Sequence, residues 1–303
     1  MSACLGLTFS IEGRGQLDYL VRKFRRMIRV GPAGYPEGSK GPRDAVERTR
    51  AEGFAALEMQ FVRQARMQQS AAEEAGRRAK ELGLGLSAHA PYYINFNSAN
   101  PETVEKSKEW VMKTVRIAHW LGARIIVMHA GSYKGRDVEG CTKAVIEGLR
   151  VCRATMEDEG VDDVLLGLET GGKKVAWGMI SEVREVMAEV DGVCPVIDFA
   201  HLHARSGGGL RTREDFDRVL DEYEEVHHGP LHAHFSCIEF TEAGERRHLS
   251  METKQPDLSL LARSLKGRKI EATLISETPE PTEGAKGMMN LLEGPARRRV
   301  KVR

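Results

Sequence analysis

The sequence has no long apolar run, no CxxC pair and few aromatic residues. Aromatic side chains are 6% of the 303 residues, and no apolar stretch has the length that a membrane crossing needs. The five cysteines are scattered and odd in number, which argues against a disulfide framework: Cys4, Cys141, Cys152, Cys194 and Cys237. No secretory leader is evident, so we expect a cytoplasmic protein with reduced, buried thiols and no membrane contact.

Neither sign of charge dominates, since the formal net charge is +1. The length suits one large domain, which we expect to span residues 27–295. We interpret residues 1–26 as an extension upstream of Met27, where the strand pattern starts. A flanking helix and a disordered arm are the alternatives for it. Residues 296–303 read as a basic C-terminal tail.

From Met27 onward, short apolar runs alternate with amphipathic stretches of helical period. The runs predict β-strands at 28–32, 55–61, 84–90, 124–129, 164–169, 195–198, 231–235 and 272–277. The helical stretches lie near 43–51, 68–82, 102–121, 139–157, 177–190, 212–223, 257–265 and 282–292. This rhythm predicts an α/β fold, a single-domain (β/α)8 TIM barrel, with a doubly wound open sheet as the alternative.

Six of the predicted strands end in a histidine or an acid. These residues are His89, His129, Glu169, Asp198, His234 and Glu277, and His201 follows soon after Asp198. In a barrel the carboxyl ends of all strands form one ring, and active sites are built on that face. Only a closed barrel brings so many strand ends around one point, which favours the barrel over the open sheet.

Each of these residues alone has a simpler interpretation. A strand-end acid commonly caps the following helix, and a strand-end histidine is usually a satisfied polar residue at the edge of a core. We expect only one of His232 and His234 to face the barrel interior and choose His234, and His203 is an alternative to His201. Recurrence on six strands is what favours a functional site.

The ring of strand ends has the composition of a metal centre. An acid that ends a buried apolar strand is unfavourable unless it is paired, and a metal ion is a common partner. The ring offers more imidazole and carboxylate atoms than one tetrahedral zinc ion needs. We therefore expect two or three divalent ions with at least one bridging carboxylate, Zn²⁺ first and Mn²⁺ or iron next.

At these residues the sequence resembles the endonuclease IV family of abasic-site nucleases, its archaeal-type members in particular, within the xylose-isomerase-like barrels. The matching motifs run in order between Met27 and Leu292: His89-Ala-Pro-Tyr, Met-His129-Ala-Gly, Leu-Glu169-Thr, Ile-Asp198-x-x-His201, His234-Phe-Ser and Ser-Glu277-Thr. The resemblance implies three zinc ions. His89, His129 and Glu169 would hold the first. Glu169, Asp198, His234 and Glu277 would hold the second, and His201 and His248 the third.

The resemblance also implies an activity: hydrolysis of the phosphodiester 5′ to an abasic site in double-stranded DNA, as in base excision repair. Glu169, Asp198 and Glu277 would lie at the reacting centre, and the ions would activate water and stabilise the phosphoryl oxygens. One position departs from the family, which places an Asp-x-His pair at the third zinc. Here Arg246 stands two residues before His248, and Glu245 is the candidate substitute.

Charge placement agrees with a polyanionic ligand. Loops predicted at the carboxyl ends of the strands carry many cations: Arg63, Arg66, Lys134, Arg136, Lys173, Lys174, Arg205, Arg211, Arg246 and Arg247. Loops predicted at the opposite end are acidic around 157–163 and 221–225. Tyr92, Arg63 and Arg66 are candidate DNA contacts by stacking or wedging. We expect a monomer that seats a duplex on one face.

Two other classes fit parts of the pattern. A sugar isomerase or epimerase uses the same barrel scaffold, since a fold does not fix a function. The paired histidines His89 and His129 and the cationic rim argue against it. A non-catalytic protein that binds DNA lesions is the second class, and Arg246 is the reason to keep it.

Overall fold

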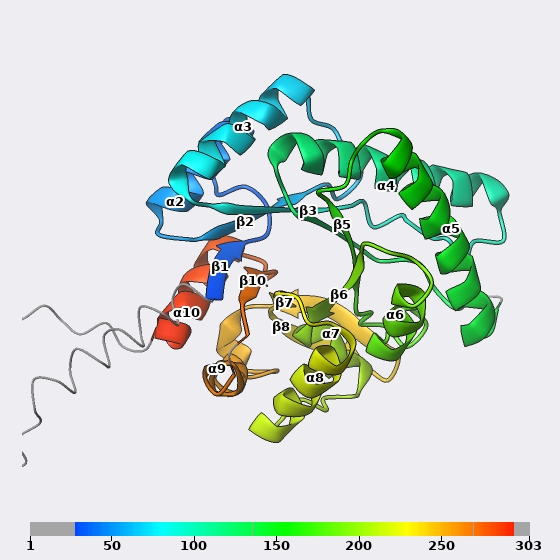
Figure 1. Ribbon diagram of the computed structural model, residues 1–303. Coiled ribbons are helices and arrows are strands. Elements are labelled where there is room, and N and C mark those ends of the chain that lie inside the picture. The colour runs from blue at the N-terminus through cyan, green and yellow to red at the C-terminus, as the bar shows by residue number, and fades with distance from the viewer. Residues whose placement is uncertain (1–27, 135, 269, 294–303) are drawn as a thin grey trace, which may run out of the picture.

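The computed structural model describes residues 28–134, 136–268 and 270–293, so the predictions for 1–26 and 296–303 lie outside the described residues. Eight parallel strands form one sheet in the order β1-β10-β7-β6-β5-β4-β3-β2 (Figure 1). Their bounds are β1 (Ile28–Pro32), β2 (Ala56–Gln60), β3 (Gly85–His89), β4 (Ile125–Met128), β5 (Leu165–Glu169), β6 (Val193–Asp198), β7 (Leu231–Phe235) and β10 (Ala272–Ser276).

The two end strands of this order meet and close the sheet. The Ala55 amide donates to the Val30 carbonyl at 3.0 Å, and the Gly34 amide donates to the Glu58 carbonyl at 2.8 Å. Ala33 and Glu58 form a parallel bridge. Gly31 allows this approach, because a Cβ there would lie 1.8 Å from the Ala56 carbonyl oxygen. The chain is therefore a nearly closed TIM barrel, as predicted, and the open-sheet alternative is wrong.

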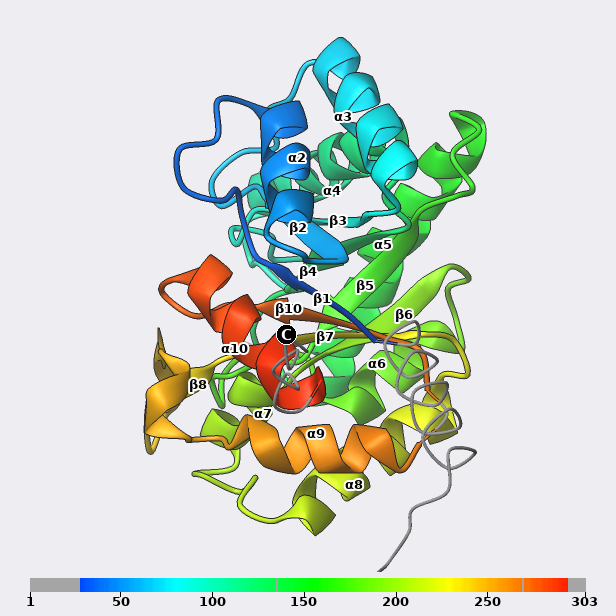
Figure 2. The ribbon, with the colours of Figure 1, turned by 90° about the vertical axis from the view of Figure 1, so that its left-hand side faces the viewer.

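Helices cover the outside of the barrel (Figures 1 and 2). They are α2 (Pro42–Ala51), α3 (Gln69–Leu82), α4 (Pro101–Leu121), α5 (Val138–Asp158), α6 (Ile180–Met187), α8 (Arg213–Val226), α9 (Leu258–Lys266) and α10 (Pro281–Glu293). Capping residues at both ends explain where helix α4 begins and ends. The Asn100 side chain accepts from the Glu102 amide at 3.0 Å, and Gly122 ends the helix at a φ of 65°. Within the described ranges, no helix is long and apolar enough to cross a membrane.

The apolar core has an outer and an inner part. Two large clusters of buried side chains lie between the sheet and the helices. A small cluster fills the middle of the barrel: Ile125, Val127, Cys194 and Val196. Side chains alternate between the two sides of each strand, so polar residues at the carboxyl ends of the same strands can face inward above this cluster. The core therefore forms a floor beneath a polar ring.

One helix, and one hairpin with the turn that follows it, were not predicted from the sequence. The short helix α7 (Phe199–Arg205) begins directly after β6, because Asp198 Oδ1 accepts from the His201 amide at 2.7 Å. A hairpin of β8 (Cys237–Thr241) and β9 (Gly244–Leu249) leaves the barrel after β7 and is followed by a 3-10 turn, η1 (Met251–Thr253). The Glu245 amide donates to the Gly172 carbonyl at 3.0 Å, which joins the hairpin to the loop after β5.

Candidate metal centre

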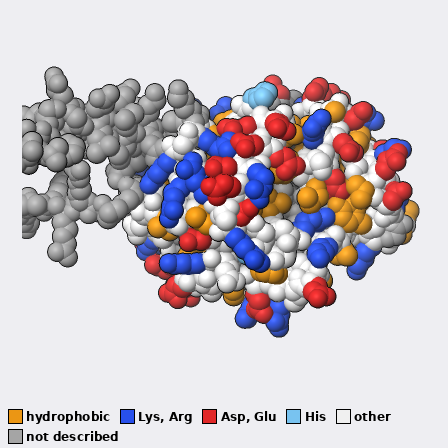
Figure 3. Space-filling model, turned by 90° about the horizontal axis from the view of Figure 1, so that it is seen from below, with side chains coloured by type: hydrophobic (Ala, Val, Ile, Leu, Met, Phe, Trp, Pro, Cys, Tyr) orange, Lys and Arg blue, Asp and Glu red, His pale blue; other side chains and the backbone are white. Residues whose placement is uncertain are grey.

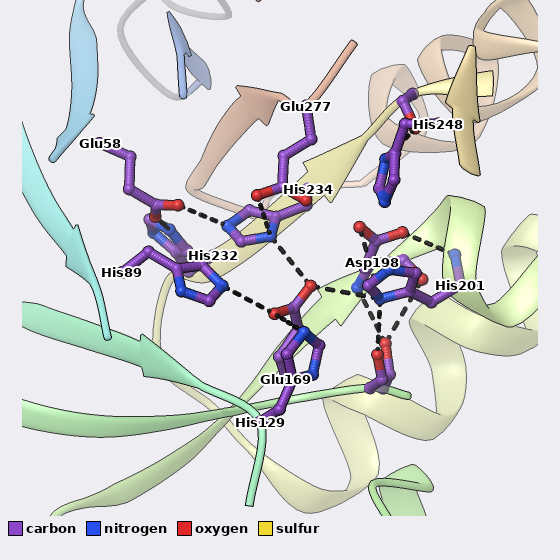
Figure 4. A network of polar contacts seen from close by, with 12 residues as sticks. Glu58, His89, His129, Glu169, Asp198, His201, His232, His234, His248 and Glu277 are labelled. Carbon is purple, nitrogen blue, oxygen red and sulfur yellow. Dashed lines mark hydrogen bonds and ion pairs between the residues drawn. The ribbon is translucent and has the colours of Figure 1, made fainter. Parts of the chain in front are cut away.

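The carboxyl ends of the strands bring the predicted side chains into one cluster (Figure 4). His89, Glu169 and Asp198 are the last residues of β3, β5 and β6, and His234 lies in β7. His129 and Glu277 each follow the last residue of their strands, β4 and β10. The ring expected from the recurrence of strand-end ligand residues is therefore present as a contiguous group of side chains.

Glu169 lies at the middle of this cluster. Its Oε2 atom is 3.1 Å from His89 Nε2 and 3.2 Å from His129 Nε2. Its Oε1 atom is 3.1 Å from His234 Nδ1 and 3.3 Å from His201 Nδ1. The side chain is fully buried, and each of its two oxygens faces a different pair of imidazoles. A carboxylate placed in this way could bridge two cations.

Five groups of described residues have the spacing of metal ligands, with all ligand atoms in each group within 4.8 Å of one another. Two of them are Glu58, His232 and His234, and His89, His234 and Glu277. The other three contain Glu169 or Asp198: His89, His129 and Glu169; Glu169, Asp198, His234 and Glu277; and Asp198, His201 and His248. The resemblance to endonuclease IV divided the residues in the same way, apart from the additional contribution of Asp198 to the third group.

An unpartnered oxygen tests whether these residues fit metal ions. Asp198 is fully buried, and its Oδ2 atom has no hydrogen-bond partner among the described residues. A buried carboxylate oxygen without a donor is unfavourable by several kcal/mol in order of magnitude. Oδ2 lies beside both the second and the third group, 3.6 Å from His201 Nδ1. A cation at this point would satisfy it, so the residues present fit the implied metal ions.

A carboxylate of the hairpin, that of Glu245, lies beside the third group. Glu245 reaches to 3.6 Å from His201 Nε2 and to 4.0 Å from His248 Nε2. Arg246 points elsewhere, because its guanidinium contacts Glu239 Oε1 at 2.5 Å on the exposed side of the hairpin. Glu245 thus lies beside both histidines of the third group, while the Arg246 guanidinium is paired at the surface.

One ring nitrogen of each of three histidines contacts a neutral oxygen, and in His201 the same nitrogen also lies 3.3 Å from Glu169 Oε1. His89 Nδ1 lies 2.8 Å from the Ala90 carbonyl, and His201 Nδ1 lies 2.9 Å from the Thr170 carbonyl. His248 Nδ1 lies 2.7 Å from Ser236 Oγ. Contacts of this kind fix which nitrogen faces inward, as in many protein metal sites. The Nε2 atoms of these three rings face carboxylates of the cluster.

The buried acids and imidazoles shift one another's pKa. Burial alone would raise the pKa of Glu169, but His129 and His234 beside it hold that pKa well below its usual range. Burial lowers the pKa of His89, and the opposing hydrogen bond and charge of Glu169 raise it to about 9. His129 differs, since burial lowers its pKa. Glu169 therefore remains a carboxylate, whereas burial raises the pKa of Glu277 at the rim of the same group.

The cluster is buried at its floor and open at its rim. Glu169, Asp198 and His234 have 1% or less of their surface exposed. The side chains of His129, His248 and Glu245 are between 22% and 32% exposed. A ligand could therefore approach from the side of β4 and the hairpin, while the oxygens at the centre stay out of bulk water.

Two predictions about histidines are wrong. His232 and His234 both face the interior, because residues two apart in a strand lie on the same side of the sheet. Their ring centroids are 5.8 Å apart, and both rings contact Glu58. His203 is no substitute for His201, since its Nδ1 accepts from the Leu210 amide at 3.3 Å and its ring packs against Phe240.

Glu58 was overlooked in the sequence because it lies inside the apolar run of β2, not at its end. It is fully buried in the barrel beside the metal-ligand candidates. Burial would raise its pKa, but the neighbouring His234 and His232 hold that pKa well below its usual range. A lone acid within a strand, with Gln60 two residues further on the same side, was the available signal.

The candidate DNA contacts lie on neighbouring loops at this end of the barrel. Tyr92 is 51% exposed, and its ring lies 4.2 Å from that of Tyr93. The Tyr92 amide donates to the Val62 carbonyl at 3.5 Å, which brings the loops after β2 and β3 together. Arg63 and Arg66 are exposed on the first of these loops. The aromatic pair and the two arginines are therefore exposed on two adjoining loops.

The predicted separation of charge is only partly present. Arg205 donates to the Lys173 and Ala176 carbonyls at 2.7 Å each, and Arg211 to the Gly208 carbonyl at 2.6 Å. Arg246 and Arg247 both pair with Glu239. At the opposite end, Arg268 neutralises Asp221 and Glu224. Figure 3 shows charges of both signs interspersed on the side seen from below. Among the described residues, fewer cations than expected are therefore unpaired at the carboxyl ends of the strands.

Comparison with known proteins places the chain in a family. Residues 46–294 match the family described as xylose isomerase-like TIM barrel, and the chain belongs to it. An uncharacterized protein of Methanocaldococcus jannaschii is 31% identical over 259 residues, which are 84% of this chain and 92% of that protein. A Staphylococcus carnosus protein named "Probable endonuclease 4" is 34% identical over 163 residues, which span 50% of this chain and only 52% of that relative.

Solved structures show the same fold. Endonuclease IV from Thermus thermophilus superposes with a TM-score of 0.67 at 21% identity, covering 88% of this chain and 99% of that one. A 3-keto-D-glucoside 4-epimerase from E. coli superposes with a TM-score of 0.63 at 15% identity, covering 88% and 99%. Nucleases and sugar epimerases thus share this barrel, so the fold alone does not choose between them.

Proposed function

We propose that the protein is a zinc-dependent endonuclease that hydrolyses the phosphodiester 5′ to abasic sites in double-stranded DNA. The observation that carries the proposal is the buried Glu169 carboxylate, which contacts four imidazoles beside the unpartnered Asp198 Oδ2. The relatives named endonuclease 4 support it over half of the chain. We expect the enzyme to act as a monomer in the cytoplasm.

The three ligand groups would hold up to three ions, with Glu169 shared between the first two. Zn²⁺ fits the nitrogen-rich donor set best, and Mn²⁺ is the next candidate. Bound zinc ions would supply an activated water and offset the charge of the phosphoryl oxygens. Glu169, Asp198 and Glu277 would lie beside the reacting phosphate, with their oxygens oriented by the surrounding imidazoles.

The rim would bind the DNA. Tyr92 and Tyr93 offer exposed aromatic faces, and Arg63 and Arg66 offer cations on the adjoining loop. An abasic nucleotide has no base pair to lose, so it leaves the duplex more easily than an intact one. The buried floor would then accept its phosphate, while these exposed residues would contact the neighbouring backbone.

The test combines metal content with cleavage. We expect two to three zinc ions per chain and incision of a duplex with one synthetic abasic site, which a chelator abolishes and zinc restores. Glu169→Gln should lower incision by more than about 100-fold, since even outer-sphere ligand partners are worth about 10–100-fold. Arg246→Ala is the matched control and should keep full activity. A metal-loaded protein that leaves the abasic duplex intact would refute the proposal.

A sugar epimerase is the second candidate. The group of Glu169, Asp198, His234 and Glu277 has the composition of a single metal site on its own, and an epimerase shares the fold. This alternative predicts one bound ion per chain, turnover of a ketose and no incision. A lesion binder, the third class, would retain the abasic duplex without cleaving it.

A further inference from the structure

We infer that Glu58 is a positioning residue for the second metal ion: it holds His234 through Nε2 so that Nδ1 is presented to the metal. The inference rests on the proposed metal centre but not on the substrate. It assigns a role to a buried acid that none of the three ligand groups of the proposed centre requires.

The two nitrogens of His234 face different acids (Figure 4). Nδ1 lies 3.1 Å from Glu169 Oε1 and 3.5 Å from Glu277 Oε1, both of which belong to the second ligand group. Nε2 faces away from that group and lies 3.0 Å from Glu58 Oε1. This Nε2–Oε1 approach is an ion-pair contact and not an aligned hydrogen bond, and the buried Nε2 atom has no hydrogen-bond partner among the described residues. Nδ1 is therefore the nitrogen that a metal can reach.

Glu58 is itself held in place by donors on both oxygens. Ser87 Oγ donates to Oε2 at 2.9 Å, and His232 Nε2 lies 2.9 Å from the same oxygen. Gln60 Nε2 donates to Oε1 at 3.0 Å and also contacts Glu277 Oε1 at 3.3 Å. A carboxylate with this many donors has little freedom to turn. Gln60 also links it directly to a second candidate ligand.

The carboxylate sets His234 apart from the other histidines. His89 and His248 turn their outer nitrogens to neutral oxygens, whereas His234 turns its outer nitrogen to a carboxylate. A carboxylate in this position makes the imidazole more basic and fixes its tautomer, so the ring binds a metal more strongly. The second ion would depend on this effect most, because His234 is the only nitrogen ligand in its group.

A fourth metal ion at Glu58, His232 and His234 is the competing interpretation, since these residues also have ligand spacing. The hydrogen bonds argue against it. Ser87 and Gln60 already donate to the Glu58 oxygens, and a cation would have to displace them. Both Glu58 oxygens therefore have hydrogen-bond donors without an ion.

The experiment compares Glu58→Gln with Glu182→Gln. Both changes keep the volume and remove the charge of a buried acid, but Glu182 lies outside the cluster, where it accepts from the Gly178 and Met179 amides. Zinc bound per chain would be titrated against a chelator of known affinity. We expect Glu58→Gln to weaken one ion by about 10–100-fold and to leave the others unchanged. Glu182→Gln should bind all ions as the wild type does, and metal-free unfolding checks that both variants fold.

Equal affinity in Glu58→Gln and the wild type would overturn the inference and leave the nuclease proposal standing. A wild type that binds no zinc would instead overturn both. A measurement on the unaltered protein covers the case in which Glu58→Gln does not fold. With ¹⁵N-labelled histidine and ¹¹³Cd in the site, His234 should couple to cadmium through Nδ1 and carry its proton on Nε2. Coupling through Nε2 would overturn the inference.

Discussion

At the scale of single residues, Asp198 shows that a helix cap and a metal ligand need not be competing interpretations. Its Oδ1 atom caps α7 through the His201 amide, and its Oδ2 atom is buried without a partner beside two ligand groups. The cap fixes the orientation of the carboxylate, so the free oxygen points into the cluster. Local structure and the proposed chemistry therefore use different atoms of the same side chain.

Glu245 provides the residue-scale prediction for the third ion. Because its oxygens lie near both His201 and His248, Glu245→Gln should reduce the bound zinc by one ion per chain. Metal analysis after gel filtration measures this loss. Arg246→Ala should change nothing, since Arg246 contacts Glu239 at the surface. Loss of the third ion in Arg246→Ala but not in Glu245→Gln would contradict the assignment.

At the scale of elements, the sequence predicts the barrel well and its additions poorly. The strands β1 and β7 have the predicted bounds, because short runs between turn residues have few alternatives. The stretch 199–205 carries no long helical period, and α7 forms through the cap at Asp198 and packing against the hairpin. The stretch 237–249 contains only two short strands, so its pairing as a hairpin depends on tertiary contacts.

The candidate site also has a part that the sequence predicts and a part that it does not. Strand-end ligands such as His89 and Glu169 could be predicted, since barrel closure alone brings them together. Glu58 could not be found by a search of strand ends, and its role depends on contacts with His234 that only the folded barrel creates. Arg205 was placed on a basic rim, whereas its donors are occupied by carbonyl groups.

Arg205 gives a prediction for the loop between β5 and α6. Its guanidinium bonds the Lys173 and Ala176 carbonyls and the Tyr133 hydroxyl. Arg205→Met keeps most of the apolar stem and should lower the free energy of unfolding by about 2–3 kcal/mol, as expected for losing charged hydrogen bonds. Urea unfolding measures the loss, and hydrogen exchange should accelerate in 171–178. Arg211→Met, which loses a bond within its own loop, should have a smaller effect.

The start of α8 gives a prediction for pH. Hydrogen bonds from the Arg211 and Thr212 amides lower the pKa of Asp215 from 3.8 to about 2. A lowered pKa in the folded state stabilises the protein above pH 3.8, and the effect is lost as the pH falls towards 2. Asp215→Asn should therefore lower the melting temperature at pH 7 and have a diminishing effect below pH 4. A deficit that is the same at pH 3 and pH 7 would contradict this.

At the scale of the whole molecule, the centre is built to remain folded without metal. Imidazoles and carboxylates compensate one another's charge around Glu169, and the apolar floor and outer clusters do not include the ligands. The metal-free chain should therefore unfold cooperatively, but at a lower temperature than the metal-bound chain. A ligand at 100 times its dissociation constant stabilises a protein by about 2.7 kcal/mol.

Chelation measures directly how much the bound ions raise the melting temperature. Removing the ions should lower the melting temperature by several degrees and leave far-ultraviolet circular dichroism at 25 °C unchanged. Restoring zinc should restore the midpoint. Loss of secondary structure on chelation would mean that the barrel depends on its ions, and an unchanged midpoint would mean that it binds none.

The position of the hairpin β8–β9 has a consequence for the third ligand group. Two of the candidate third-site ligands, Glu245 and His248, lie on this excursion, whereas the other ligand groups lie on the barrel wall or directly after it. Substitutions in the hairpin leave the strand register untouched. In the proposed metal centre, a change in this surface segment would therefore alter the third ligand group and leave the eight-stranded wall and the first two groups as they are.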